Sequence, residues 1–109
     1  MDPNLSSLLD KMERQCEVLG RARNDYLAME AERKHFEARL VQLAEGKSQA
    51  EKVTNAQASE DYLEFHKKLA RLLAVFEFQK LKFEVLDREF WAVYGAHKSE
   101  DRMIRKMGS

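Results

Sequence analysis

Apolar residues in the second half of the chain fall on two opposite faces of one expected helix. One stripe contains Tyr62, Phe65, Leu69, Leu72, Phe76, Phe83, Leu86, Phe90 and Val93. The other contains Ala70, Ala74, Phe78, Leu81, Val85 and Ala92. A helix that packs on a single neighbour needs only one apolar stripe. The second stripe therefore predicts a second packing partner, which in a chain this short we expect to be another copy.

The first half of the chain carries a heptad pattern that starts at a helix-capping signal. Asp2 is a good N-cap, and Pro3 is tolerated at the first helical position. The two sets of heptad positions are Leu5, Met12, Leu19, Tyr26, Arg33 and Leu40, and Leu8, Gln15, Ala22, Met29, Phe36 and Leu43. Only Arg33 and Gln15 interrupt the apolar pattern. A repeat sustained this long predicts coiled-coil-like packing.

A turn is expected between the two halves. Gly46 is a helix terminator, and Ser48 with Glu51 forms the S-x-x-E pattern of a capping box. These signals predict helices over about residues 3–45 and 49–94, joined by a turn at 46–48. Helices of similar length joined by a short turn pack antiparallel.

The register and the C-terminal end follow from the same signals. Folding about positions 46–47 would place Arg33 against Glu60, and we expect these two residues to pair. Gly95 is the natural end of the second helix, and Ser99 can cap a short helical stub within the tail 95–109.

The pattern as a whole predicts an all-α fold, a single helical-hairpin domain over residues 1–109 that self-associates into a helical bundle. The expected interface between copies is Ala74, Phe78, Leu81 and Val85. Exposed apolar patches of this kind usually mark interfaces. In the alternative interpretation, the stub folds back and covers the second stripe with Met103, Ile104 and Met107. The dimer and the tetramer stay equally open.

Charge changes this picture only locally. The chain has 19 basic and 19 acidic residues and a net charge of zero, so it lacks the basic excess of a dedicated nucleic-acid binder. The tail nevertheless concentrates positive charge, and its candidate contacts to a partner or to nucleic acid are Lys98, Arg102, Arg105 and Lys106. A second basic cluster is His66, Lys67, Lys68 and Arg71. Alternatively, such charges only solubilise a helix.

Candidate chemistry is sparse. Glu32 and His35 have the i, i+3 spacing of di-iron bundles, but neither His66 nor His97 has a Glu three residues before it. Cys16 is the single cysteine, and no nucleophilic partner is evident. We therefore expect no catalytic site, no metal and no cofactor, and not an enzyme. Without a signal peptide or a membrane-spanning run, we expect a cytoplasmic protein that does not contact membranes.

Residues 58–90 resemble the second half of small helical proteins encoded by tailed bacteriophages and prophages. The agreement lies in Tyr62-Leu63-Glu64-Phe65, in Phe78-Gln79-Lys80-Leu81-Lys82-Phe83 and in Asp87-Arg88-Glu89-Phe90. The resemblance implies a cytoplasmic phage accessory protein that acts near replication or recombination. Together with the stripes, it favours a protein–protein interaction, adaptor or assembly protein. The alternatives are a nucleic-acid-associated accessory protein that uses the basic tail, and an export or assembly chaperone.

Overall fold

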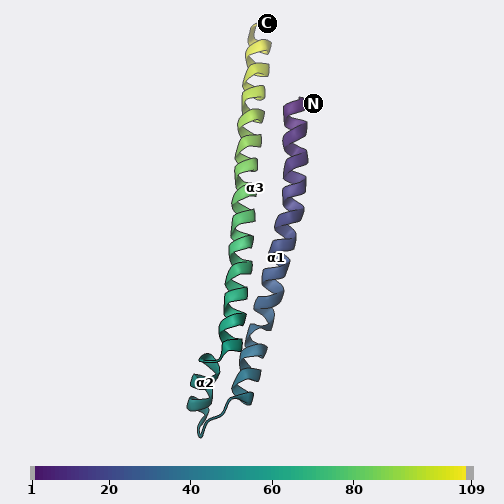
Figure 1. Cartoon of the computed structure of the whole chain (residues 1–109). Coiled ribbons are helices and arrows are strands. Elements are labelled where there is room, and N and C mark those ends of the chain that lie inside the picture. Colours follow the sequence, from purple (N-terminus) through teal and green to yellow (C-terminus); the bar gives the residue numbers. More distant parts are fainter. Residues whose placement is uncertain (1, 108–109) are drawn as a thin grey trace. The chain divides into compact units, whose positions relative to one another are not determined.

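The computed structural model describes residues 2–107, and the described chain is helical with no strand. Its helices are α1 (Pro3–Leu43), α2 (Gln49–Gln57) and α3 (Glu60–Met107). Helices α1 and α3 run antiparallel, and α2 lies in the connection between them (Figure 1). The predicted all-α helical hairpin is therefore confirmed.

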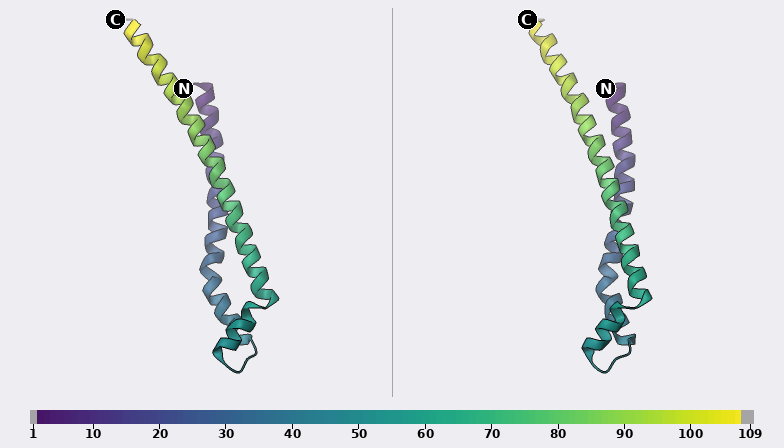
Figure 2. Two further views of the ribbon diagram at one scale, coloured as in Figure 1. Left: turned by 90° about the vertical axis from the view of Figure 1, so that its left-hand side faces the viewer. Right: turned by 60° about the vertical axis from the view of Figure 1, so that its left-hand side comes forward.

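The chain divides into two compact units, and each contains a segment of α1 beside a segment of α3. The terminal unit contains residues 2–20 and 78–107 of the described chain, and the turn unit contains residues 21–77. In the terminal unit, α3 continues past the first residue of α1, as both views of Figure 2 show.

Helix α1 begins at the predicted cap. The Asn4 N–H donates a hydrogen bond of 2.6 Å to Asp2 Oδ1, and the Ser6 N–H donates one of 3.0 Å to the Asp2 carbonyl. The side chain thus satisfies one of the backbone N–H groups that lack a partner in the first turn. The helix ends at Leu43, two residues earlier than expected.

The capping box at the connection is confirmed on one side and altered on the other. The Glu51 N–H donates to Ser48 Oγ over 3.2 Å, as the S-x-x-E pattern predicts. The Glu51 carboxylate, however, accepts from the Lys47 N–H over 2.7 Å instead of from Ser48. Gly46 lies so close to α2 that an added Cβ would stand 2.9 Å from the Lys52 backbone nitrogen. The connection therefore requires glycine at this position because of close backbone approach.

The predicted continuous second helix over 49–94 is wrong at two places. The first is Ala58–Ser59, where α2 ends and α3 begins. Ser59 Oγ accepts from the Tyr62 N–H over 3.2 Å and donates to the Ala56 carbonyl over 2.6 Å. Since one serine caps the new helix and bonds the end of the previous one, the chain changes direction without glycine or proline.

The second place is Gly95, which does not end the helix. Helix α3 continues through Gly95 and Ser99 to Met107, so the separate stub capped by Ser99 is also wrong. Glycine lowers helix stability by about 1 kcal/mol relative to alanine, which a long packed helix can accommodate.

The core is a narrow seam between α1 and α3. Its most buried side chains are Leu5, Leu8, Ala22 and Leu69, and Ala56 of α2 is buried as well. The first apolar stripe is half-buried or buried at every position, as predicted. In the turn unit the Phe36 and Phe65 rings stack with centroids 4.4 Å apart, and Tyr26 lies 6.1 Å from Phe76.

The register in the turn unit differs from the expected one. Folding about positions 46–47 would have placed Phe36 beside residue 57, but Phe36 lies against Phe65 because α2 occupies the intervening residues. Arg33 consequently does not pair with Glu60. It bonds Glu30 at 3.1 Å and Glu37 at 3.6 Å on its own helix. The hydrogen bond to Glu30 raises the pKa of the guanidinium, and attraction to both carboxylates adds to the effect.

Candidate interaction surface

The outward face of α3 in the terminal unit carries large apolar side chains that the chain itself leaves exposed. Phe78, Leu81 and Val85 are 56%, 59% and 60% exposed. They follow one another at intervals of three and four residues, which places them on one side of the helix. Ala74, four residues before Phe78 in the same helix, is exposed as well. All four predicted interface residues are therefore available to a partner.

Phe78, Leu81 and Val85 line a shallow groove of about 440 Å³, together with Gln15, Lys82 and Leu86, whereas Ala74 lies outside it. The Gln15 amide group is already bonded across the seam, to the Gln79 carbonyl at 3.0 Å and to Gln79 Oε1 at 2.8 Å. This pair explains why glutamine is tolerated at an apolar heptad position. The Lys82 ammonium group lies 5.1 Å from the Phe78 ring centroid, so its charge borders the apolar surface.

The C-terminal segment does not cover this groove. Met103, Ile104 and Met107 belong to α3 and are 63%, 66% and 83% exposed. The interpretation in which they fold back onto the second stripe is therefore wrong, because the helix continues where a turn would be needed.

The candidate basic contacts lie near the start of α1. Lys98, Arg102 and Arg105 line a groove of about 550 Å³ with Asp2, Leu5, Phe90, Tyr94, His97 and Asp101. His97 pairs with Asp2, and the Lys98 ammonium group lies 5.6 Å from the Tyr94 ring centroid. Among residues 2–107, neither Arg102 nor Arg105 forms an ion pair. Lys106 is exposed but does not line this groove. The surface is thus of mixed charge with a positive excess.

An aromatic cluster borders this groove. The Phe90 ring lies 5.4 Å from the Trp91 ring and 6.1 Å from the Tyr94 ring. Trp91 is 57% exposed, whereas Phe90 is half-buried in the seam. Large, partly exposed aromatic side chains are typical anchors of interfaces.

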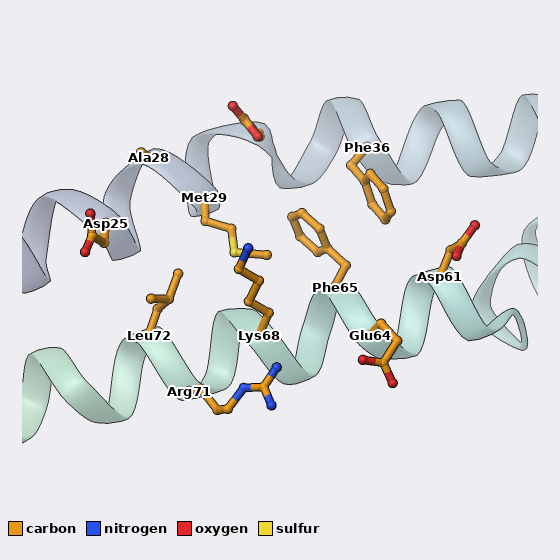
Figure 3. A pocket seen from close by; sticks show the side chains of 11 residues that line it. Asp25, Ala28, Met29, Phe36, Asp61, Glu64, Phe65, Lys68, Arg71 and Leu72 are labelled. Atoms are coloured by element: carbon orange, nitrogen blue, oxygen red, sulfur yellow. The ribbon is translucent and has the colours of Figure 1, made fainter.

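Another surface groove lies in the turn unit, and the sequence patterns did not single it out. It has a volume of about 980 Å³ and is lined by Asp25, Ala28, Met29, Glu32, Phe36, Asp61, Glu64, Phe65, Lys68, Arg71 and Leu72. Figure 3 shows the stacked Phe36 and Phe65 rings between the helices and Lys68 reaching toward Met29. The available signal was that charged residues recur at helical spacing both in residues 25–32 of α1 and in residues 61–71 of α3. The sequence did not reveal that these two segments face each other, because the expected register was displaced.

The other candidate groups do not come together. His66 bonds Glu37 at 2.9 Å, so the basic cluster at 66–71 is divided between the seam and the turn-unit groove. Glu32 and His35 are exposed, and no group of three or more potential ligands in the described chain could hold a metal ion. Cys16 is exposed and free.

No helix within residues 2–107 is long and apolar enough to cross a membrane. No protein-family model, curated protein or solved structure matches the chain. The resemblance of residues 58–90 to phage-encoded proteins stays a prediction.

Proposed function

We propose that this chain is a non-enzymatic interaction protein, an adaptor or assembly factor that works as a homo-oligomer. The observation that carries the proposal is the row of Phe78, Leu81 and Val85, each more than half exposed on the helix face opposite the seam. Isolated apolar side chains on a surface are ordinary, but a contiguous row on one helix face is typical of an interface.

Light scattering coupled to size exclusion tests self-association, with Leu81→Glu as the variant and Leu27→Glu as the matched control. Leu27 is 44% exposed on α1, so its substitution places the same charge on a different helix. We expect an oligomeric wild type, a monomeric Leu81→Glu variant and an oligomeric control. A wild type that is monomeric at all accessible concentrations would contradict the proposal.

A second candidate is a nucleic-acid-associated accessory protein, in keeping with the resemblance to phage proteins. The specific support is the groove near the start of α1, where Arg102 and Arg105 form no ion pair within the described chain. Phosphate contacts make affinity fall steeply with salt. Changing Arg102, Arg105 and Lys106 to Ala should abolish such binding in a fluorescence anisotropy titration, and unchanged binding would refute this candidate.

An export or assembly chaperone is the weaker alternative, since the region of α2 is polar and largely exposed. Its setting, like that of the adaptor, would be the cytoplasm.

A further inference from the structure

Side-chain size changes along the outward face of α3 in a way that the isolated hairpin does not explain. Following the face at steps of three and four residues, the first half presents Phe78, Leu81 and Val85, and the exposed Arg88 stands between the two halves. The second half presents Ala92, Gly95 and Ser99, all of them exposed. The first half of the face therefore carries large side chains and is called the raised half below. The second half carries small side chains and is called the low half.

Gly95 is the clearest case. Its backbone is helical, and a Cβ added there would meet nothing within 4 Å. Glycine is the least favourable residue after proline in a helix interior. The hairpin leaves the space beside Gly95 open, so the backbone there can be approached closely by a side chain of a partner.

The charges beside the face change sign along the same direction. Lys82 precedes Glu89 by seven residues, so both lie on the same edge of the outward face, and both are exposed. When two helices pack antiparallel, such an edge meets the same edge of the partner in the reverse order. Residues that flank an apolar seam form the ion pairs that determine partner orientation.

We propose that the partner on this face is a second copy of the chain, antiparallel, with its low half against the raised half of the first. Leu81 then packs on the partner's Ala92, and Phe78 occupies the space left by the partner's Gly95. In this register Lys82 lies beside the partner's Glu89, and symmetry repeats each contact. The inference rests on the proposed self-association and adds to it an orientation and a register.

The competing arrangements bring like charges together. An antiparallel pair shifted by one heptad stacks Leu81 on the partner's Val85, but it sets Lys82 beside the partner's Lys82. A parallel pair aligns Phe78 with the partner's Phe78 and sets Arg88 directly against the partner's Arg88, whereas the proposed register sets Arg88 beside the partner's Val85. Like charges placed opposite each other are destabilising, most strongly when they are desolvated.

Disulfide trapping tests this register. In a Cys16→Ser background, one preparation carries Leu81→Cys and another carries Ala92→Cys. Disulfides need Cα atoms closer than about 7 Å. In the proposed pair residue 81 faces residue 92, whereas two copies of residue 81 lie roughly 16 Å apart along the helix axis. We expect a covalent dimer only when the two preparations are mixed before oxidation.

The outcomes separate the inference from the proposed function. Covalent dimers from either preparation alone would indicate parallel packing or a shifted antiparallel register and would overturn the inference. An oligomer by light scattering that forms no covalent dimer in the mixture would likewise overturn it, while the proposed self-association would stand. A monomeric wild type would overturn both.

A second variant measures the role of Gly95. Gly95→Leu improves helix propensity, and its Cβ meets nothing within 4 Å in the hairpin. In the proposed pair it collides with the partner's Phe78. We expect an unchanged or higher helix content with at least a tenfold weaker dimer. A dimer as tight as wild type would contradict the packing of Phe78 on glycine.

Discussion

The substitution of leucine by alanine at two positions of α3 should separate the hairpin core from the interaction surface. Leu69 is 9% exposed and Leu81 is 59% exposed. Both changes remove the same atoms from the same helix and give the same gain in helix propensity. Any difference between the two variants therefore reports the surroundings of the side chain.

The loss of stability caused by Leu69→Ala should appear in the folding of the single chain. Complete burial of leucine contributes about 1.5–3 kcal/mol, and a cavity adds to the loss on truncation. Since Leu69 is almost fully buried in a two-helix seam that can partly collapse, we expect Leu69→Ala to lower the free energy of unfolding by about 2–3 kcal/mol. Association of the copies that remain folded should hardly change.

The loss of free energy caused by Leu81→Ala should appear in the association of two copies. Burying the remaining 59% of the side chain in a dimer is worth about 0.9–1.8 kcal/mol per copy. Leu81 is buried twice in a two-fold interface, once from each copy. The free energy of dimerisation should therefore weaken by about 2–3.5 kcal/mol, which raises the dissociation constant roughly 20- to 400-fold. The free energy of unfolding of the single chain should fall by less than about 1 kcal/mol.

Urea unfolding followed by circular dichroism at several protein concentrations measures both effects, because the stability of a dimer depends on concentration. Leu69→Ala should lower the transition midpoint at every concentration, whereas Leu81→Ala should shift the onset of the concentration dependence to roughly 20- to 400-fold higher protein concentration. Equal effects of the two variants at all concentrations would refute the distinction between seam and outward face.

Two further predictions concern glycine and the ion pairs. Gly46→Ala should lower the thermal midpoint, at a loss of about 1–3 kcal/mol, because the new Cβ would stand 2.9 Å from the Lys52 nitrogen. Gly20→Ala is the matched control and should stabilise the chain by up to about 1 kcal/mol, since a Cβ there meets nothing within 4 Å. If Gly46→Ala also stabilised the chain, the close approach of Gly46 to Lys52 would be absent. For Arg33, a double-mutant cycle with Glu30 should give a small favourable coupling, as for exposed helical pairs, and a cycle with Glu60 should give none. A larger coupling to Glu60 would restore the register expected from folding about positions 46–47.

The seam was predictable because side-chain periodicity determines which face of a helix is buried. Each member of the first stripe is buried or half-buried, and each of Ala74, Phe78, Leu81 and Val85 is exposed. The heptad pattern of α1 fails only at its last member, Leu43, which is 75% exposed because the helix ends there.

The break at Ala58–Ser59 was not predicted because no glycine or proline marks it. The signal was present in another form, since Ser59 is followed by Glu60 and Asp61. A serine cap with acidic residues in the first turn is a typical helix start. Missing this start displaced the register and with it the partner of Arg33. The identity of the molecule on the outward face could not follow from periodicity, which shows that a face is apolar but not what covers it.

The order in which the contacts between helices can form depends on the number of residues that separate the two contacting groups in the chain. The Asn55 side chain bonds the Glu45 carbonyl across 10 residues, His66 bonds Glu37 across 29, and Gln15 bonds Gln79 across 64. Each doubling of a loop costs about 0.6 kcal/mol in closure entropy, so helix pairing should begin near α2 and proceed toward the termini. The row from Phe78 to Val85 would then reach its final surroundings late in folding. A nascent or partly folded chain would accordingly lack the Gln15 side of the groove beside this row, and its unpaired seam residues would stay exposed to other chains.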